Sequence, residues 1–405
     1  MRKNEYWTGF AAGALAVAAG CILAVSAYSF ARSQRGYVLS DPAKAARLES
    51  LEDLIDDYYL NETDDEQLAQ GLYKGLIAGL GDRYSYYYTP EEYSEEKRDS
   101  EGSYEGIGVL MQAQEDGTIL LVECYEGGPG RMAGLQRGDI LTRIDDKDVR
   151  DLTLIEMAEY IGSRSEGTVS LSVLRNQDGR EETLEIKVPV TQVELPSVTS
   201  EMVTDKIGYI QIQEFQSVSY HQFCESLEDL KGKGMQGLII DLRENPGGYV
   251  DVVCDILRTI LPEGLIFYTE DKNGNREEEY CDGETPIEIP LVVLVNNGSA
   301  SASEIFAGAV KDYGIGTIIG TTTYGKGVVQ SIRAYPDGSA VKLTVSHYYT
   351  PLGNDIHEVG ITPDIVVEQE EAEEEEEMED IQLERAIAFL EGMNENKADK
   401  NLKTD

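Results

Sequence analysis

The stretch LVVLVNNGSASASEIFAGAV, residues 291–310, decides the fold, because it passes from one kind of secondary structure to another through a short turn. Residues 291–295 form an unbroken apolar run, which is typical of a strand buried on both faces. A helix is expected over 301–312, since Ser301 and Glu304 have the spacing of a capping box. A buried strand followed by a helix is the repeating step of an α/β fold.

The same alternation continues on both sides of this stretch. Helical patterns occupy 219–232 and 249–261, and no internal repeat is visible. The pattern therefore predicts an α/β core in which most strands are buried. The other apolar strands are IGYIQIQ (207–213), GLIIDL (237–242), TIIGT (317–321) and LTVSHYY (343–349).

Ser301 is the candidate nucleophile, because α/β folds present reactive groups at the ends of their strands. It also has a purely structural explanation, since S-x-x-E at the start of a helix is by default a capping box. A base is sought in TTTYGKGVVQS, residues 321–331, where Lys326 lies between two glycines and Gln330 follows four residues later. Lys326 must be neutral near pH 7 to act as a base, and only burial lowers a lysine pKa that far. Taken alone, its default interpretation is a solvated surface charge.

The histidines argue against a Ser-His-Asp triad. There are three, His221, His347 and His357, and none lies in a glycine-rich or strand-terminal motif near a serine. A Ser-Lys arrangement is the remaining nucleophilic option.

A third segment, DLRENPGGYV at 241–250, ends a buried strand in a tight turn. Its two glycines leave backbone N–H groups accessible, as an oxyanion hole requires. Taken alone, this is an ordinary turn.

A different pattern, of short strands and turns, extends over 103–190. In chain order it contains GIGVLMQ, TILLVECY, AGLQRGDILTRIDDKDV, one helix and VSLSVLR. The helix is well marked, because Thr153 and Glu156 form a capping box and the apolar residues that follow share one face.

Together these segments resemble the C-terminal processing peptidases of peptidase family S41, which include the tail-specific and photosystem D1-processing proteases. DLRENPGG, VNNGSASASEI, GTTTYGKGVVQ, YYTPLGNDI and VGITPD occur in the family's order and at about its spacing. The resemblance implies a serine endopeptidase with a Ser-Lys dyad, and the apolar N-terminal stretch described below predicts that it is membrane-tethered. The implied catalytic residues are Ser301 as nucleophile, Lys326 as general base and Gln330 as the residue that orients the lysine, with oxyanion donors from Ala302 and from either Gly247 or Gly248.

Region 103–190 looks like a PDZ domain. In that family a glycine-containing loop donates N–H groups to the C-terminal carboxylate of a peptide, which adds a strand to the sheet edge. In YEGIGV the candidate donors are Ile107, Gly108 and Val109, and the helix from Thr153 forms the other wall of the groove. The resemblance thus implies that protein substrates are selected by their C-termini.

The fold that this resemblance implies is α/β: a crotonase/ClpP-like peptidase core with an inserted PDZ domain, itself a partly open β-barrel, and an N-terminal helical region. Apolar faces at 48–80 and 381–392 need a partner, and the resemblance supports a homodimer. The expected domains are an N-terminal membrane or signal segment with linker (1–36), a helical region (37–100), the PDZ domain (101–192), the peptidase core (193–367), and an acidic linker with a C-terminal helix (368–405).

The N-terminal stretch 8–30 is apolar and long enough, at ~1.5 Å per residue, to cross a ~30 Å hydrocarbon core. Basic residues precede it, which favours an N-terminus inside. We expect an uncleaved anchor and a single-pass cell-membrane protein with its catalytic part outside the cytoplasm. A signal peptide cut after Ala27 or Ala31 and a lipoprotein signal ending at Cys21 are the alternatives.

The composition excludes several classes of function. The chain has 76 acidic and 34 basic residues and a formal net charge of −42. Nucleic acid is therefore not expected as a partner, because phosphate binding needs clustered Lys and Arg. Residues 368–380 form an acidic block that we interpret as a solvated spacer. The five cysteines have no CxxC spacing and no nearby histidine, so no metal or other cofactor is expected.

Two rival functions fit parts of the sequence. Residues 320–326 fit the nucleotide-binding pattern G-x-x-x-x-G-K. However, Gly327 replaces the Ser or Thr that would hold magnesium, and a strand follows where a helix is needed. The other rival is a catalytically inactive PDZ adaptor, which peptide cleavage by the purified protein would distinguish from an enzyme.

Overall fold

The computed structural model describes residues 38–114, 116–164, 167–177, 179–369 and 379–401. The chain divides into two compact units, Met1–Leu76 and Ile77–Asp405, which are described separately. The predicted membrane segment at 8–30 lies outside the described residues.

The localisation predicted from the sequence needs correction. Among the helices that the structure describes, none has the length and apolar character needed to span a bilayer. The prediction of a single-pass membrane protein is therefore withdrawn.

The first unit contains two helices, α2 (Pro42–Tyr58) and the start of α3 (Asp65–Ala78), after a short 3-10 turn η1 (Val38–Ser40). Asp41 caps α2, because its carboxylate accepts the N–H of Ala43 at 3.0 Å. Leucines on both helices remain exposed, among them Leu51 and Leu72. The part of the predicted apolar face (48–80) that lies in this unit is thus present and is not buried within the unit.

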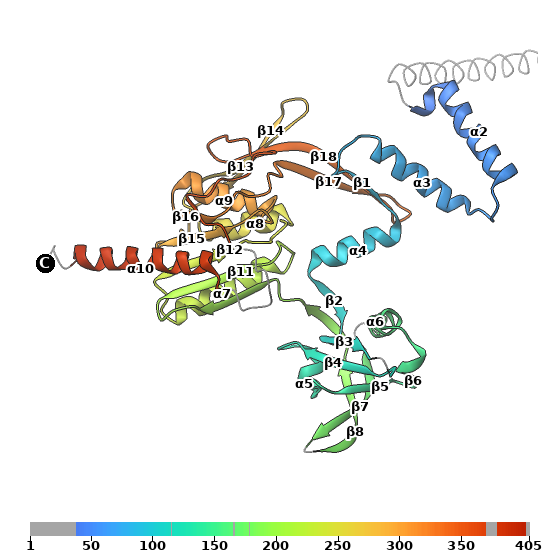
Figure 1. Ribbon diagram of the computed structural model, residues 1–405, viewed down its shortest axis with the longest axis horizontal. Coiled ribbons are helices and arrows are strands. Elements are labelled where there is room, and N and C mark those ends of the chain that lie inside the picture. Colours follow the sequence, from blue (N-terminus) through green and yellow to red (C-terminus); the bar gives the residue numbers. More distant parts are fainter. Residues whose placement is uncertain (1–37, 115, 165–166, 178, 370–378, 402–405) are drawn as a thin grey trace, which may run out of the picture. The chain divides into compact units, whose positions relative to one another are not determined.

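Near its start, the second unit has a strand that joins the sheets of region 193–367, before the expected PDZ region. β1 (Tyr86–Tyr88) pairs antiparallel with β18 (Ala340–Tyr349), with Tyr87 opposite Val341. Helix α4 (Pro90–Glu101) follows, with Thr89 and Glu92 in a reciprocal capping box. Because β1 is separated from its sheet by the whole PDZ region, that region is inserted into the peptidase fold (Figure 1).

The PDZ region is a small β structure with its own apolar core, built around Leu121, Leu141 and Leu171. Its main sheet has the strand order β3-β4-β5-β7-β8, with β6 on β5, and β2 pairs with β9. The predicted helix is α6 (Leu154–Gly162), and its capping box is confirmed, since the N–H of Thr153 donates to Glu156 at 2.8 Å. The other elements are β2 (Ser103–Gly106), β3 (Val109–Ala113), β4 (Ile119–Cys124), α5 (Pro129–Ala133), β5 (Ile140–Ile144), β6 (Lys147–Asp148), η2 (Val149–Asp151), β7 (Thr168–Gln177), β8 (Arg180–Pro189) and β9 (Thr191–Glu194).

The central sheet of region 193–367 has the order β10-β11-β12-β15-β16-β19, and all pairs except β10–β11 are parallel. Every residue of β12 and β15 is buried, as the sequence predicted. The elements are β10 (Val198–Met202), β11 (Ile207–Ile212), α7 (Ser219–Gly232), β12 (Gly237–Asp241), α8 (Val250–Arg258), β15 (Leu291–Val295), α9 (Ala302–Tyr313), β16 (Gly316–Gly320) and β19 (Ile365–Val366).

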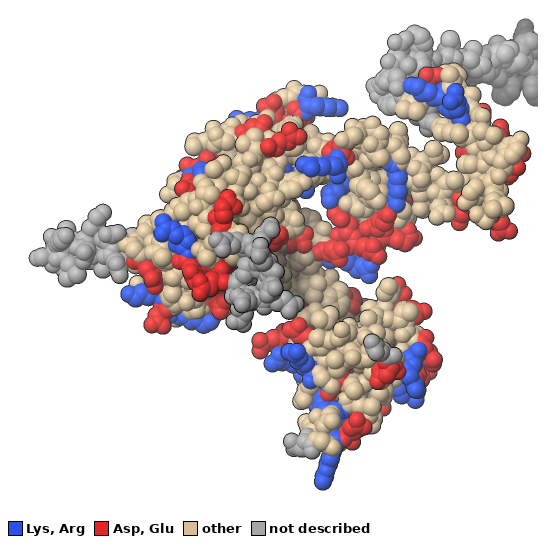
Figure 2. Space-filling view, in the orientation of Figure 1, with Lys and Arg blue, Asp and Glu red and all other residues tan. Residues whose placement is uncertain are grey.

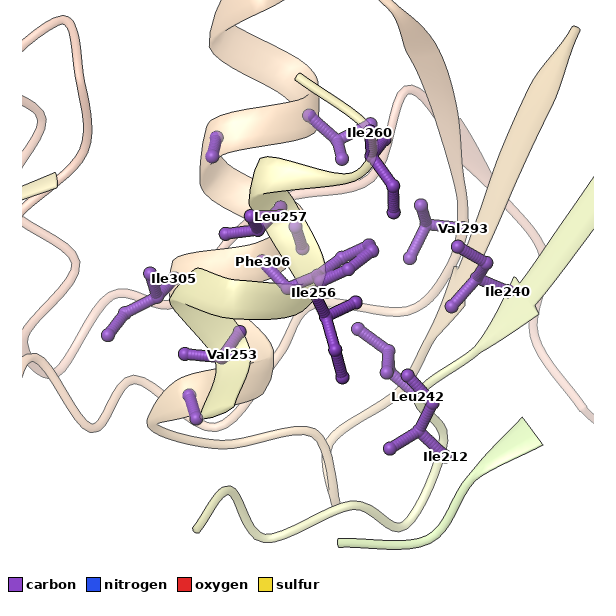
Figure 3. Packing of buried hydrophobic residues seen from close by; sticks show 14 of the residues in the cluster. Ile212, Ile240, Leu242, Val253, Ile256, Leu257, Ile260, Val293, Ile305 and Phe306 are labelled. Atoms are coloured by element: carbon purple, nitrogen blue, oxygen red, sulfur yellow. The ribbon is translucent and has the colours of Figure 1, made fainter. Parts of the chain in front are cut away.

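Helices α7, α8 and α9 cover one face of this sheet. Ile256 of α8 and Phe306 of α9 pack against Ile240 and Val293 of the central strands (Figure 3). A second, antiparallel sheet covers these helices, with β18, β13 (Gly264–Asp271) and β14 (Arg276–Cys281) in a row and β17 (Val328–Ala334) on β18. The helices that carry the active-site loops are therefore held between two sheets (Figure 1).

The other face of the central sheet is covered by the C-terminal helix α10 (Ile381–Asn401). Ala386 and Leu390 are fully buried against strand residues such as Ile239 and Val292. The prediction that residues 381–392 expose an apolar face in need of a partner was therefore wrong, because the chain's own sheet covers that face.

An ion-pair network fixes the start of α10. The guanidinium of Arg243, just past β12, donates to Asp380 at 2.7 Å through two nitrogens and to Asp241 at 2.6 Å. Burial opposes the charge of Arg243, but the hydrogen bonds to Asp380 and Asp241 raise its pKa. This network joins the C-terminal helix to the strand that leads into the DLRENPGG turn.

The acidic character of the chain is visible on its surface. Figure 2 shows carboxylates gathered over α4, whose sequence PEEYSEEKRDSE contains six of them. Lys342 of β18 pairs with one of these residues, Glu96, at 2.7 Å. Since neither side chain is fully exposed, this pair ties α4 to the second sheet.

Candidate active site

The predicted nucleophile lies where β15 passes into α9. Ser301 has φ 55° and ψ −114°, a backbone conformation that residues other than glycine rarely adopt. Such strain costs on the order of 1–3 kcal/mol and is concentrated at functional sites. The sharp turn from a strand into a helix presents the serine at the end of the sheet, as in other nucleophile turns.

The carboxylate of Glu304, three residues further on, joins the Ser301 turn to the Lys326 segment. Its Oε2 accepts the backbone N–H of Ser301 at 2.9 Å and that of Lys326 at 2.8 Å. Its Oε1 accepts the N–H of Gly325 at 2.7 Å and the hydroxyl of Thr323 at 2.6 Å. Glu304 is fully buried. The main chains of Ser301 and Lys326 therefore meet at one oxygen atom.

The side chain of Lys326 is half-buried, and its Nζ lies 5.2 Å from the centre of the Tyr84 ring. Burial lowers the pKa of Lys326, and the positive charge of Lys342 lowers it further. The carboxylates of Glu304 and Glu96 act in the opposite direction without reversing the net effect. A lysine in this environment is the kind that can lose its proton and act as a base.

The DLRENPGG turn lies directly against the nucleophile. Gly247 and Gly248 have φ of 114° and 132°, which L side chains rarely adopt. A Cβ atom on Gly247 would lie 2.7 Å from the Cβ of Ser301, and one on Gly248 would lie 2.3 Å from the carbonyl oxygen of Phe215. Both positions therefore require glycine.

The two glycine amides have different surroundings. The N–H of Gly247 donates to the side chain of Asn245 at 2.8 Å. The N–H of Phe215 donates to the carbonyl of Gly247, and the N–H of Tyr249 donates to the carbonyl of Phe215, each at 2.7 Å. These two bonds form a parallel bridge between Phe215 and Gly248, in which the N–H of Gly248 points away from Phe215. Of the two glycine amides, that of Gly248 is the one with no acceptor among the described residues.

Serine side chains fasten this turn to the nucleophile turn. The carbonyl of Asn245 accepts the N–H of Ala300 and the hydroxyl of Ser303, both at 3.0 Å. The carbonyl of Leu242 accepts the hydroxyl of Ser299 at 2.7 Å. The serine- and alanine-rich sequence NGSASAS is thus used to join two turns that lie about 55 residues apart along the chain.

Gln330 lies on β17, four residues after Lys326. Its amide contacts the carbonyl of Val328 at 3.4 Å and the hydroxyl of Thr344 at 3.5 Å. No hydrogen bond joins it to Lys326 in this arrangement of the described residues, so its orienting role stays a prediction. Of the three histidines, His221 pairs with Glu225, and His347 and His357 contact each other. No hydrogen bond between a histidine and Ser301 is found among the described residues.

Sequence reasoning missed two groups that the structure brings to the site. The hydroxyl of Tyr348, which is fully buried, donates to the carbonyl oxygen of Ser301 at 3.0 Å. Burial raises its pKa well above the usual range, so it stays a donor. The second group is the aromatic segment YSYYYTPEEY at 84–93, which brings Tyr84 to Lys326. Its density of tyrosines was the signal that could have marked it.

The predicted carboxylate-binding loop lies between β2 and β3 of the PDZ region. The backbone amides of Gly108 and Val109 face the hydroxyl oxygen of Tyr104, whose pKa burial nevertheless raises to about 12. The carbonyls of Ile107 and Gly108 accept N–H groups from Gly130 at 2.7 Å and from Tyr125 at 2.9 Å. Backbone hydrogen bonds therefore hold the loop through its carbonyl groups, and two of its amides influence the Tyr104 hydroxyl.

No cluster of three or more His, Cys, Asp or Glu side chains suitable for a metal ion occurs among the described residues. Four cysteines are described, all as free thiols, and three of them, Cys124, Cys254 and Cys281, are buried.

Comparison with known proteins gives two family matches. The model of "Peptidase family S41" matches residues 206–367, and that of "PDZ domain" matches residues 106–188. The chain is 35% identical over 318 residues to the "Carboxy-terminal processing protease CtpA" of Bacillus subtilis, which covers 78% of this chain and 67% of that protein. It is 36% identical over 299 residues to the "Carboxyl-terminal-processing protease" of Synechocystis sp., covering 73% of this chain and 70% of that protein.

Among solved structures, the photosystem II D1 C-terminal processing protease matches with 25% sequence identity and a TM-score of 0.47. The match covers 84% of this chain and 92% of that one.

Proposed function

Since this chain belongs to the carboxy-terminal processing proteases of peptidase family S41 and carries their PDZ domain, we propose that it is a serine endopeptidase with a Ser301–Lys326 dyad. The PDZ domain selects its protein substrates by their C-termini. The observation that carries the dyad is the buried carboxylate of Glu304, which binds the backbone N–H groups of both residues with one oxygen.

The proposed reaction has two stages. Neutral Lys326 takes the hydroxyl proton of Ser301 as its Oγ attacks the scissile carbonyl carbon, and the same proton then goes to the leaving amine as the C–N bond breaks. The acyl group stays on Ser301 as an ester. Lys326 then takes a proton from water, the resulting hydroxide attacks the ester, and the acid product leaves as Ser301 regains its proton.

The developing oxyanion requires two donors that are not used elsewhere. We assign them to the N–H of Ala302, the first residue of α9, and to the N–H of Gly248. Gly247 is the weaker choice because its N–H already donates to Asn245 at 2.8 Å. Its role is to let the turn approach Ser301 closely.

The proposed selection of substrates rests on the loop before β3. Its Gly108 and Val109 amides lie close enough to the hydroxyl of Tyr104 to lower its pKa, and a peptide carboxylate would offer a charged oxygen to the same donors. Ile107 stays a proposed third donor. Helix α6 packs beside β2 and β3, which leaves the edge of β3 for an added strand.

Two further proposals concern assembly and fold. The apolar hollow of about 300 Å³ between α2 and α3, lined by Leu48, Leu51, Ile55, Leu68 and Leu72 among others, supports association of two copies through these helices. The parallel sheet with its crossover helices supports a crotonase/ClpP-like core, and the PDZ sheet supports a partly open barrel.

The test is labelling with a serine-reactive fluorophosphonate, followed by mass spectrometry of the modified peptide, together with cleavage of an unfolded protein substrate. We expect the label on Ser301, and neither label nor cleavage in Ser301→Ala. A folded wild-type protein that neither reacts nor cleaves at any pH would favour the rival function, a catalytically inactive PDZ adaptor.

A further inference from the structure

The turn before β1 brings an aromatic ring to the amine of the proposed base. The Nζ of Lys326 lies 5.2 Å from the centre of the Tyr84 ring, and the guanidinium carbon of Arg83 lies 4.9 Å from the same centre. The hydroxyl of Tyr84 is buried and has no hydrogen-bond partner among the described residues. The side chains of Arg83 and Tyr324 lie close enough to this hydroxyl to influence its pKa. What Tyr84 presents to the amine of Lys326 is its ring.

Hydrogen bonds hold this turn in place. The carboxylate of Asp82 accepts the backbone N–H of Tyr84 at 3.0 Å and the hydroxyl of Ser85 at 2.6 Å. The N–H of Thr344 on β18 donates to the Ser85 hydroxyl at 3.1 Å. The chain after Tyr84 is therefore attached to the second sheet twice, first by this hydrogen bond at Ser85 and then by the pairing of β1 with β18.

An aromatic ring over an amine has two opposite effects. Its π face attracts an ammonium ion by about 0.5–1 kcal/mol at exposed sites and ~2 kcal/mol when desolvated. Its bulk excludes water, and full burial can lower the pKa of a lysine by roughly 3–5 units. Lys326 is half-buried, and burial is the main cause of its lowered pKa, so the exclusion of water outweighs the attraction of the surrounding charges for its ammonium form.

The other charged groups near Lys326 do not reverse this balance. Lys342 on β18 disfavours a second positive charge, while Glu304 on α9 and Glu96 on α4 favour it. Glu96 also pairs with Lys342 at 2.7 Å, so these two partly cancel. On the turn itself, Arg83 adds a positive charge beside the Tyr84 ring.

We propose that Tyr84 is a positioning residue for the catalytic base, because its ring keeps water away from the amine of Lys326 so that the amine can accept the Ser301 proton. This inference rests on the proposed dyad. It adds a residue from before the PDZ insertion to a site whose other members all follow that insertion.

The first test is the pH dependence of kcat/KM for wild type, Tyr84→Phe and Tyr84→Ala. Phenylalanine keeps the ring, so Tyr84→Phe is expected to keep the wild-type midpoint. Tyr84→Ala admits water, so its midpoint is expected to move upward by about one pH unit, a tenfold loss on the acidic side that is recovered at alkaline pH. Partial unfolding would lower the rates without moving the midpoint.

The second test follows Lys326 without requiring cleavage. Reductive methylation with formaldehyde and cyanoborohydride modifies only neutral amines, and mass spectrometry gives the rate at Lys326 as a function of pH. We expect the same upward shift in Tyr84→Ala and none in Tyr84→Phe. If the wild type is active and Tyr84→Ala has the same midpoints as the wild type, the inference is overturned. It is also overturned if Tyr84→Phe shifts the midpoints as far as Tyr84→Ala does. A wild type that never labels Ser301 would instead overturn the proposed function.

Discussion

Replacing Glu304 by glutamine tests whether one buried carboxylate organises the active site. The carboxylate accepts four hydrogen bonds, two at each oxygen, from Ser301, Lys326, Gly325 and Thr323. Glutamine has a single acceptor oxygen. This oxygen is expected to keep the hydrogen bonds from the N–H groups of Ser301 and Lys326. The new NH2 group then faces Thr323 and Gly325, and the Thr323 hydroxyl can rotate and accept a hydrogen bond from it, whereas the backbone N–H of Gly325 cannot accept one.

The cost of Glu304→Gln then has a definite size. The N–H of Gly325 is left facing another donor in a buried setting, which costs about 1–3 kcal/mol. For a domain of this size that lowers the melting temperature by roughly 2–12 °C. Glu304→Ala would leave up to three backbone N–H groups unpaired, roughly 3–9 kcal/mol, which is comparable to the whole stability of a domain. Glutamine is therefore the informative substitution.

Catalysis should change in a direction that stability does not predict. The negative charge of Glu304 raises the pKa of Lys326, so its removal lowers that pKa and leaves the amine neutral at lower pH. Glu304→Gln should thus have a lower maximal activity than the wild type, and the midpoint of its pH profile should lie at lower pH. The expected shift for Tyr84→Ala has the opposite direction. The measurements are scanning calorimetry and kcat/KM over a pH series.

A matched control is Glu92→Gln, since Glu92 holds the same capping-box position on α4, where it accepts the N–H of Thr89 at 2.9 Å. There the substitution should cost a few tenths to about 1 kcal/mol and leave the pH midpoint unchanged. If Glu304→Gln had the melting temperature and the pH midpoint of the wild type, the carboxylate would have no organising role and the reasoning would be refuted.

Three further predictions concern the base, the substrate and the assembly. Activity should rise with pH as Lys326 loses its proton, and Lys326→Arg should be inactive at every pH, because a guanidinium does not act as a base. If Lys326→Arg cleaved substrate, another residue would have to be the base. A peptide with an amidated C-terminus should bind more weakly than its free acid by about 1.5–3 kcal/mol, and equal cleavage of both forms at subsaturating concentration would exclude reading of the terminus. Sedimentation at micromolar concentration should give a dimer that Leu68→Glu with Leu72→Glu converts to monomer, whereas a wild-type monomer would exclude association through α2 and α3.

Local features of this chain could be predicted from its sequence. The strand over 291–295 and the helix over 219–232 were confirmed, because a continuous apolar run and helical periodicity are properties of neighbouring residues. The Thr153–Glu156 capping box was confirmed for the same reason. The family and its PDZ domain followed from motifs that are each continuous in sequence.

Features that depend on distant partners could not be predicted. Arg243 and Asp380 are 137 residues apart, and nothing local in either segment indicates that they meet. The apolar face of 381–392 was correctly recognised, but periodicity cannot say whether a sheet of the same chain or a second chain covers it. Tyr84 was missed because a tyrosine near a lysine is defined by packing, and 242 positions separate them in the sequence.

The backbone conformation of Ser301 has a consequence for how inactive variants should be read. Alanine keeps the side-chain clash at φ 55°, whereas glycine adopts that conformation without it. Ser301→Gly should therefore release part of the strain and fold more stably than the active protein, while Ser301→Ala preserves the geometry that the substrate meets. Selection for folding alone would place a glycine at this position. Under the proposed mechanism, a serine at this position gives up stability for activity, which is the exchange expected of a catalytic residue.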